Sequence, residues 1–475
     1  MKRLSLFFAL LLAACTQPSY PGIDRPSGGG NTATDQSVID YIDQRLEAEY
    51  YWLDEVQSKC NTFNRTVKWE AYLDNVLGTL NTNSDDGYIS SKGQRVFYSY
   101  IREVPATTRS SVTGFGIDLH TTIVVINSEQ HYYGFVVENV YEASPAKYSD
   151  IRRGDIITMV NKGYITPNNY ITLFNSIYAN TVSQVELQVM RRAGDGGKEE
   201  TFKVDLTAAP YQECTVAHCE IIRGNKPVGY LVYTGFESES DEALKAALRS
   251  FADEGVREII LDLRTNGGGS LYSAITLSST LLAADHQEDL LCEVRRNPKN
   301  TKSETIELFN IEATEFNIGI ERLTAIVSNN TASASELVIM GLRGLDIPVT
   351  LVGTTTQGKN CGMDVTRRTI GSGSGSLVVE YAPITFMCFN AKGFGEWGDG
   401  IAADIDAKAL DKNYPLPAAP WGSSYVEYDA ALALALESVG YEPITTASTR
   451  AIGDVEWPTA ATIVKPTKGI CLELE

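Results

Sequence analysis

Apolar runs of strand length alternate with amphipathic segments over almost half of the chain, from about residue 211 to residue 439. Residues 228–233 and 258–263 are two such runs, and residues 241–254 between them gather their apolar side chains on one face of a helix. Strands that alternate with helices indicate helices packed in layers on a sheet. We therefore predict an α/β core over residues 209–440.

Two earlier segments follow other patterns, so the chain is expected to hold several domains. At roughly 150 residues per domain, its 475 residues predict about three. Residues 37–110 carry apolar side chains at helical spacing and are predicted to form a helical N-terminal domain, in which nothing suggests chemistry. Residues 111–208 hold short β-rich runs bounded by Gly, Asn or Asp, which predict strands. We assign no role to the irregular tail, residues 441–475.

Charge and histidine content disfavour two classes of protein. Asp and Glu number 60 against 40 Lys and Arg, and a formal charge of -20 is repelled by phosphate backbones. We therefore expect no nucleic-acid partner. The four histidines are scattered without a close pair, which disfavours a metal site, and no cofactor is expected; they are His120, His131, His218 and His286.

The first fifteen residues have the pattern of a secretory signal: two basic residues, an apolar run, and small residues before Cys15. The segment L-A-A-C that ends there resembles the bacterial lipobox, in which the cysteine is acylated. This resemblance implies a lipid-anchored lipoprotein of the bacterial cell envelope, facing the periplasm or the cell surface. An ordinary signal peptide with an incidental cysteine is the alternative. Residues 16–36, rich in Pro, Gly, Ser and Thr, are predicted to be a flexible linker.

Seven of the eight cysteines follow Cys15, and an odd number in an oxidising compartment leaves at least one unpaired. Cys214 and Cys219 are five residues apart and could form a disulfide. They could equally be small buried hydrophobic residues. The spacing leaves both possibilities open.

Three loops in the predicted core place small and polar residues after apolar strands. Residues 262–269 read D-L-R-T-N-G-G-G, where glycines allow backbone N–H groups to approach a ligand closely. In the second loop Ser333 and Glu336 fit a helix capping box, although a nucleophilic serine also belongs at a strand-to-helix turn. Residues 353–359 read G-T-T-T-Q-G-K, the core of a nucleotide-binding P-loop, but Asn360 stands where that motif needs Ser or Thr.

Together the three loops resemble those of the C-terminal processing peptidases, also called tail-specific proteases, a family of serine proteases with a Ser/Lys dyad. Residues 331–336, T-A-S-A-S-E, align with the family's S-A-S-A-S-E, which implies that Ser333 is the nucleophile. The family's G-x-x-T-x-G-K pattern falls on residues 353–359 and implies that Lys359 is the general base. Burial among apolar residues would lower the pKa of such a lysine and let it act near neutral pH.

The same resemblance implies roles for the residues around the dyad. The backbone N–H of Ala334, with that of Gly268 or its neighbour Gly269, would hold the oxyanion. Glu336 would support the site or only cap the helix. Met363 stands where many members of the family carry a glutamine that orients the lysine, so support for the base must come from elsewhere.

Residues 111–208 resemble a PDZ domain, through a Gly-rich loop and through S-P-A at residues 144–146 with I-R-R-G-D-I-I at 151–157. PDZ domains take an extended peptide as an added strand and hold its terminal carboxylate in backbone N–H groups of that loop. The peptide-binding loop would be formed by Gly114, Phe115, Gly116 and Ile117. A PDZ-shaped spacer whose groove binds nothing is the alternative.

These expectations combine into a multidomain α/β fold with a helical N-terminal unit, a PDZ-like β-rich domain and a crotonase-like α/β serine protease core. The implied activity is that of a serine-type endopeptidase that cleaves peptides or proteins near a free C-terminus. A catalytically impaired relative that binds peptides as a scaffold or receptor is the main alternative, and nucleotide binding by the P-loop-like segment is a second.

Overall fold

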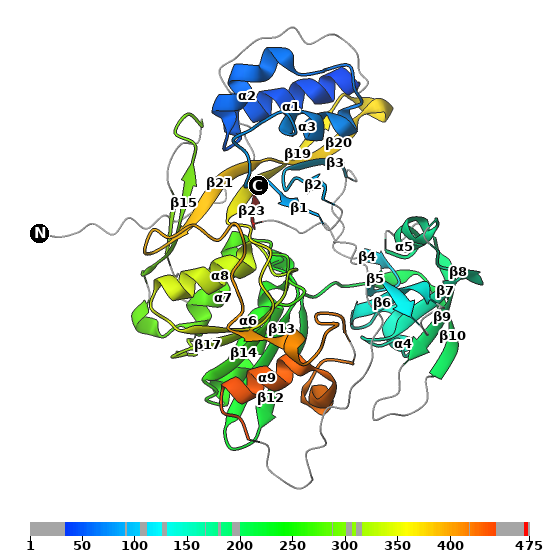
Figure 1. The fold of residues 1–475 in the computed structure, drawn as a ribbon, viewed down its shortest axis with the longest axis vertical. Helices are drawn as coiled ribbons and strands as arrows, with labels where there is room; N and C mark the ends of the chain where they lie inside the picture. The colour runs from blue at the N-terminus through cyan, green and yellow to red at the C-terminus, as the bar shows by residue number, and fades with distance from the viewer. Residues whose placement is uncertain are drawn as a thin grey trace, which may run out of the picture.

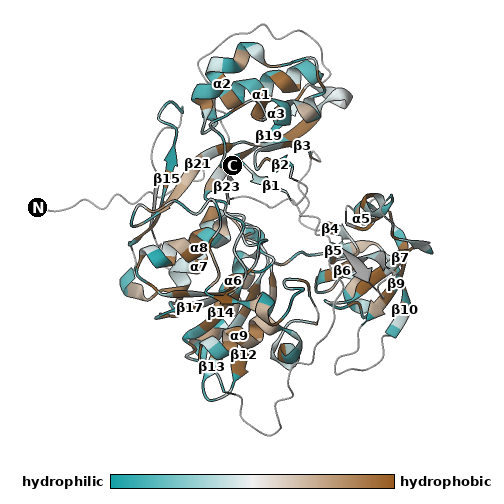
Figure 2. Cartoon of the chain, in the orientation of Figure 1, coloured by the Kyte–Doolittle hydropathy of each residue, from teal (hydrophilic) through white to brown (hydrophobic). Residues whose placement is uncertain are grey.

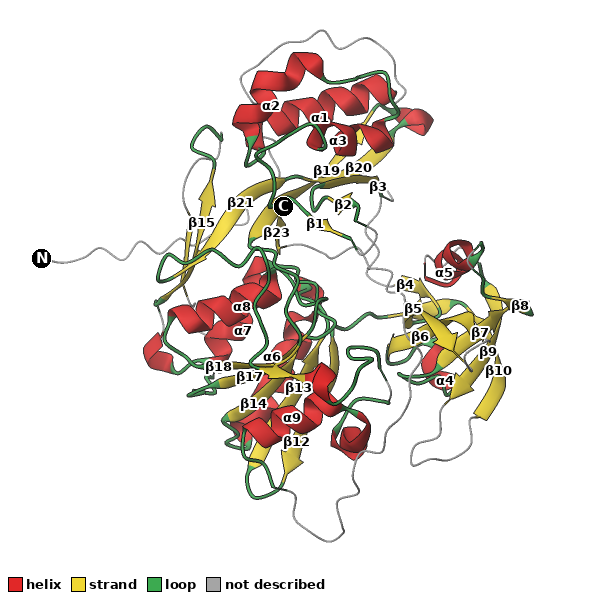
Figure 3. Cartoon of the chain, viewed as in Figure 1, coloured by secondary structure: helices red, strands yellow, loops and turns green. Residues whose placement is uncertain are grey.

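The computed structural model is drawn in Figure 1, and Figure 3 shows its helices and strands. It describes residues 34–90, 93–104, 112–125, 131–166, 168–178, 182–191, 200–286, 288–300, 306–309, 316–417, 419–442 and 470–473. Cys15, the predicted signal and most of the predicted linker lie outside these residues. Within the part of the chain that the structure describes, no helix is long and apolar enough to span a bilayer.

The N-terminal unit consists of three helices and three short strands. The helices are α1 (Asp35–Glu49), α2 (Leu53–Lys59) and α3 (Trp69–Leu77), and the strands are β1 (Tyr88–Ile89), β2 (Arg95–Val96) and β3 (Tyr100–Glu103). Helix α1 begins inside the predicted linker because Thr34 caps it, its hydroxyl accepting from Ser37 N at 3.2 Å. The strands lie in the segment predicted as helical, since strands this short carry too few residues to show an alternating pattern.

A PDZ domain follows, as predicted, with its own hydrophobic core. Its main sheet has the order β10-β9-β7-β6-β5, in which β5 is an edge strand next to helix α5, and β4 pairs with β11 outside that sheet. The elements are β4 (Val112–Gly114), β5 (Ile117–Val125), β6 (His131–Val140), α4 (Pro145–Tyr148), β7 (Ile156–Val160), β8 (Gly163–Tyr164), α5 (Tyr170–Tyr178), β9 (Gln184–Arg191), β10 (Glu200–Thr207) and β11 (Ala209–Tyr211).

The predicted α/β core is built on a sheet of order β12-β13-β14-β17-β18-β22, parallel except for the edge strand β12. Its strands are β12 (Val216–Arg223), β13 (Pro227–Tyr233), β14 (Glu258–Asp262), β17 (Leu323–Val327), β18 (Val349–Gly353) and β22 (Ile405–Asp406). Its helices are α6 (Asp241–Asp253), α7 (Leu271–Leu281), α8 (Ala334–Gly344) and α9 (Ala430–Ser438).

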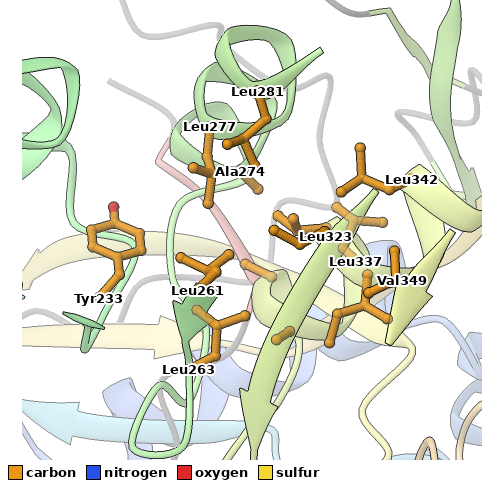
Figure 4. Close-up of a cluster of buried hydrophobic side chains, with 14 of the residues drawn as sticks. Tyr233, Leu261, Leu263, Ala274, Leu277, Leu281, Leu323, Leu337, Leu342 and Val349 are labelled. Carbon is orange, nitrogen blue, oxygen red and sulfur yellow. The ribbon is translucent and has the colours of Figure 1, made fainter. Parts of the chain in front are cut away.

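Both faces of this sheet are buried, which explains why its strands are continuous apolar runs. In β13, Leu231 and Tyr233 pack with α6, α7 and α8, while Tyr230 and Val232 pack with α9 on the opposite face. Figure 2 shows hydrophobic residues along the central strands, and Figure 4 shows the cluster beneath α7 and α8 in which Leu261, Leu323 and Leu337 meet.

A second sheet joins the core to the N-terminal unit, and its order is β16-β15-β21-β19-β20-β3. Its strands from the core are β15 (Leu290–Arg296), β16 (Ile306–Phe309), β19 (Cys361–Ile370), β20 (Leu377–Ala382) and β21 (Ile384–Asn390), while β23 (Ile470–Glu473) from the tail pairs with β19. Strand β3 pairs with β20, and α1–α3 pack on this sheet in one hydrophobic cluster (Figure 1). The N-terminal unit and the core therefore share one sheet and one hydrophobic cluster.

Candidate active site

The three loops singled out in the sequence follow neighbouring parallel strands. They leave the carboxyl ends of β14, β17 and β18, which stand side by side in the sheet. Loops at the carboxyl ends of parallel strands meet at one edge of the sheet. The order of the strands therefore brings together segments that are far apart in the sequence.

Ser333 occupies a strained turn between β17 and α8. Its backbone has φ 61° and ψ -114°, a conformation that costs a non-glycine residue on the order of 1–3 kcal/mol. It caps α8, so its side chain stands at the end of the helix where backbone N–H groups lack intrahelical partners. This strand–turn–helix setting is the one in which a nucleophilic serine is presented.

Ser335, the other serine of the segment, has a structural role. Its hydroxyl donates to the backbone carbonyl of Asn266 at 3.0 Å, and its side chain is buried. Thr331, which replaces the first serine of the family's motif, donates its hydroxyl to Leu263 O at 2.8 Å. Both hydroxyls bond the serine loop, residues 328–336, to the glycine loop, residues 262–269, which favours Ser333 as the reactive residue.

Glu336 connects the serine loop to the lysine loop, residues 353–359. Its Oε2 accepts from both Ser333 N and Lys359 N at 2.8 Å, and its Oε1 accepts from Gly358 N at 2.7 Å and from the Thr356 hydroxyl at 2.5 Å. Burial raises the pKa of Glu336, and these hydrogen bonds oppose that effect. The sequence left open whether Glu336 supports the site or only caps the helix. Its carboxylate does more than cap the helix, because it accepts from the backbone N–H groups of both predicted catalytic residues.

Gly268 lies directly against the predicted nucleophile. A Cβ at this position would lie 2.8 Å from Ser333 Cβ and 3.0 Å from Ala334 N, and the φ of 104° also requires glycine. The predicted oxyanion donors Gly268 and Ala334 are thus brought together. The N–H of Gly268, however, donates to Asn266 Oδ1 at 2.9 Å in this structure.

Asn266 is a residue of the site that the sequence reasoning passed over. It is fully buried, and its side-chain amide also donates to Tyr233 O at 2.9 Å. Its own carbonyl accepts from Ala332 N at 3.1 Å as well as from Ser335. Its place within the D-L-R-x-N-G-G-G motif was the available signal, and its role is to hold the glycine loop against the serine loop.

Lys359 is fully buried, and its Nζ lies 4.4 Å from the ring centroid of Tyr98. Tyr98 belongs to the N-terminal unit, where the sequence suggested no chemistry. Met363, in place of the family's glutamine, is buried in the hydrophobic cluster that the N-terminal unit shares with β19–β21. The surroundings of the lysine therefore come partly from the N-terminal unit.

The P-loop interpretation of residues 353–359 is excluded by the local fold. A P-loop continues into a helix after its lysine, whereas strand β19 begins at Cys361. The backbone N–H groups of Gly358 and Lys359, which would have to cradle a phosphate, both donate to Glu336. This segment is a lysine-bearing loop of the serine site.

The described histidine side chains lie with acidic partners outside the three loops. His120 pairs with Glu138, and His286 with Asp289. His218 shares Glu220 with Ser423, but the carboxylate stands between the histidine and the serine, so the histidine does not accept the serine's proton. Among the described residues no group of His, Cys, Asp or Glu could hold a metal ion. Cys214 and Cys219 are free thiols and neither is fully buried.

The residues predicted to form the peptide-binding loop of the PDZ domain span the end of β4 and the start of β5. Gly116 has φ 74°, and a Cβ there would lie 2.1 Å from Ser144 Cβ, so only glycine fits. Phe115 O accepts from Ala146 N at 3.0 Å, which ties the loop to α4. Gly114, Phe115, Gly116 and Ile117 are buried and lead into the edge strand β5, beside α5. An edge strand next to a helix is suited to pairing with an added peptide strand.

Residues 227–406 match peptidase family S41, and residues 121–206 match the PDZ domain. The chain is 23% identical over 292 residues to the chloroplastic carboxyl-terminal-processing peptidase 1 of Arabidopsis thaliana, an alignment that covers 61% of this chain and 56% of that protein. It is 26% identical over 273 residues to a protein named as a CtpA-like serine protease in Staphylococcus aureus, covering 57% and 49%.

The chain thus spans about half the length of the curated relatives it matches. Among solved structures, a crystal structure described as an S41 protease from Bacteroides fragilis superposes with a TM-score of 0.65 at 22% identity, covering 84% of this chain and 97% of that one. The superposition supports the fold. The two matched families support the predicted order of a PDZ domain followed by a peptidase core. Residues 227–406 are therefore a peptidase S41 core and residues 121–206 a PDZ domain, and this combination supports the resemblance to the C-terminal processing peptidase family.

Proposed function

We propose that this protein is a serine-type endopeptidase that cleaves peptides or proteins near a free C-terminus, with Ser333 as nucleophile and Lys359 as general base. The observation that carries the proposal is the carboxylate of Glu336. One of its oxygens binds the backbone N–H of Ser333 and that of Lys359, each at 2.8 Å. A single buried group therefore fixes both residues of the dyad relative to each other.

The mechanism uses the neutral amine of Lys359 to take the proton from the Ser333 hydroxyl as its oxygen attacks the scissile carbonyl. The tetrahedral oxyanion is held by backbone N–H groups of Ala334 and of the glycine loop, where Gly268 exchanges its bond to Asn266 for the oxyanion or Gly269 donates instead. Lys359 then returns its proton to the leaving amine. In the second half of the reaction Lys359 takes a proton from the water that attacks the ester on Ser333. The carboxylic acid product leaves, and the proton passes to the Ser333 oxygen, which restores the free serine.

The PDZ domain supplies the preference for free C-termini in this proposal. An extended substrate pairs with the edge strand β5, and its terminal carboxylate binds the loop of Gly114, Phe115, Gly116 and Ile117. Substrates with amidated C-termini lose this charged contact. They are expected to be cleaved more slowly than their free counterparts.

The test is mass spectrometry of matched peptides with free and amidated C-termini after incubation with the protein. We expect cleavage of the free peptides, full loss of cleavage in Ser333→Ala, and retention in Ser335→Ala, whose hydroxyl is bonded to Asn266 O. Lys359→Arg should also be inactive, because guanidinium stays protonated at any working pH. Cleavage by Ser333→Ala, or peptide binding without any labelling of Ser333 by a serine-reactive probe, would contradict the proposal.

We also propose that Cys15 carries lipid and holds the protein at a membrane of the bacterial cell envelope. The support is the sequence alone: a basic start, an apolar run and the L-A-A-C segment. The protein should partition into detergent, and Cys15→Ser should be released in soluble form or stay an uncleaved precursor. A processed N-terminus at any residue other than Cys15 would refute this proposal.

A further inference from the structure

The amine of Lys359 faces the N-terminal unit. Its Nζ lies 4.4 Å from the ring centroid of Tyr98, close enough for the ring to attract a cation. The two side chains are 0% and 6% exposed, so water screens this contact little. The Tyr98 hydroxyl points elsewhere, accepting from Gln357 Nε2 at 3.5 Å.

Asp86 holds the turn that carries Tyr98. Its Oδ1 accepts from Tyr98 N at 3.1 Å and from Ser99 N at 2.8 Å, and its Oδ2 accepts from the hydroxyls of Tyr50 at 2.7 Å and Ser99 at 2.6 Å. The carboxyl group is fully buried. Two backbone donors that cannot reverse favour its ionised form.

This carboxylate also acts on the lysine through its charge. Burial raises the pKa of Asp86, while hydrogen bonds and the charge of Lys359 lower it. The interaction is mutual, so the ionised Asp86 stabilises the protonated lysine. The Tyr98 ring and the Asp86 carboxylate thus both favour the protonated form of Lys359, and both belong to the N-terminal unit.

The other titratable groups near the lysine come from two further elements. Cys361 of β19 feels the charges of Lys359, Asp86 and Asp85, and Glu336 of α8 binds the backbone N–H of Lys359. Burial raises the pKa of Cys361 and that of Tyr98, so the thiol and the phenol stay uncharged near neutral pH. Asp85, Asp86 and Glu336 are therefore the acidic groups near Lys359 and Cys361 within the described residues, and Asp86 is the one whose charge interacts with that of the lysine.

Resting on the proposed function, we propose that Tyr98, held by Asp86, is a positioning residue that aims the Lys359 amine at the serine loop, and that this pair sets the pH at which the lysine becomes an active base. The N-terminal unit then contributes to the active site. The contact with Tyr98 fixes the orientation of the amine, and the charge of Asp86 raises the pH at which Lys359 loses its proton.

The two effects separate in the dependence of kcat/KM on pH. Tyr98→Leu removes the ring, so we expect the alkaline plateau to fall at least about tenfold, in kcat more than in KM, and the acidic limb to move to lower pH. Asp86→Asn keeps the two backbone acceptor bonds and removes the charge, so the plateau should stay within a few fold while the acidic limb moves down by about one pH unit. Tyr98→Phe keeps the ring and should match the wild type.

Tyr72→Leu is the matched control for general damage to the N-terminal unit. Tyr72 is fully buried and bonded to a carboxylate, Asp43 Oδ1, at 2.7 Å, but it lies in α3 and its hydroxyl faces α1. This variant should be less stable to heat and keep the wild-type acidic limb. The positioning role is overturned if Tyr98→Leu gives the wild-type profile, or if Tyr72→Leu moves the limb as far as Tyr98→Leu does.

A second measurement is independent of turnover. In protein labelled with ¹³C-lysine, the Cε signal of Lys359 is identified by its loss in Lys359→Met and titrated by NMR. We expect its midpoint to fall in Asp86→Asn and Tyr98→Leu and to stay unchanged in Tyr98→Phe. An inactive wild type whose lysine titration still responds in this way would overturn the peptidase function and leave the Tyr98–Asp86 assignment standing. An unresponsive titration overturns the assignment itself.

Discussion

Two buried side chains, those of Glu336 and Asn266, hold the loops of the site in place by hydrogen bonds to several backbone groups. Glu336 accepts four hydrogen bonds, three of them from backbone N–H groups of the serine loop and the lysine loop. Ser333 keeps a positive φ of 61° only because the surrounding bonds hold it there. Asn266 bonds the glycine loop to the serine loop, as Glu336 bonds the lysine loop to it. The chemistry assigned to Ser333 and Lys359 therefore depends on buried acceptors that perform no chemistry themselves.

Replacing Glu336 with glutamine tests this dependence. Each carboxylate oxygen accepts from at least one backbone N–H, so either orientation of the amide places its NH₂ group against a backbone donor. We expect Glu336→Gln to lower the free energy of unfolding by about 2–3 kcal/mol and kcat by about 100-fold. Thermal melts and turnover measure the two effects. Glu242 is exposed and pairs with Lys245, so Glu242→Gln should change neither quantity. A fully active Glu336→Gln enzyme would show that the carboxylate is dispensable.

At the scale of elements, one contact from the PDZ domain enters the core. Arg153 is buried, its guanidinium stacks on Trp421 with 3.3 Å to the ring centroid, and it donates to Ala419 O at 2.6 Å. Burial and the nearby charge of Arg264 lower the pKa of Arg153 to about 10. The guanidinium remains charged, and its desolvation costs part of what the contact contributes.

Arg153→Met should therefore loosen the attachment of the PDZ domain without unfolding the core. The methionine fills part of the space but offers neither the stacking cation nor the donor to Ala419. We expect a larger radius of gyration in small-angle scattering and faster hydrogen exchange around residues 419–421, with a melting temperature of the core within about 4 °C of the wild type. The neighbouring Arg152→Met is the control, since Arg152 is exposed and pairs with Asp150 inside the PDZ domain. Equal expansion in both variants would mean that Arg153 does not anchor the domain.

The elements that the sequence predicted are those with strong local patterns. The alternation of strands and helices in the core, the PDZ strands and the helix start at Ser333 follow from periodicity and from motifs within one short segment. The strand β3, the tail strand β23 and the contact of Tyr98 with Lys359 depend on segments more than a hundred residues apart, such as β3 with β20. No local pattern encodes such pairing, so the contribution of the N-terminal unit to the lysine could not be read in advance.

In the whole molecule, the PDZ domain is an insertion into a fold formed by the N-terminal unit and the core. Strands β4 and β11 at its two ends pair with each other, Val112 opposite Tyr211, so the chain enters and leaves the domain at one place. The PDZ domain has a hydrophobic core of its own, whereas the helices α1–α3 bury their apolar faces against β19, β20 and β21. The N-terminal unit therefore packs with the core that follows the PDZ domain in the sequence, while the PDZ domain between them has its own hydrophobic core.

Two deletions distinguish these dependences. Replacing residues 112–211 by a short Gly/Ser linker removes a self-contained domain whose ends are adjacent, so we expect a monomeric product that melts cooperatively and still labels at Ser333 with a serine-reactive probe. Removing residues 34–104 exposes the apolar face of the second sheet and the free edge of β20, which favours aggregation. Size-exclusion chromatography and thermal circular dichroism report both results. A soluble, cooperatively folding core without residues 34–104 would show that the N-terminal unit is an independent domain, and the surroundings of Lys359 would then have to be complete without Tyr98 and Asp86.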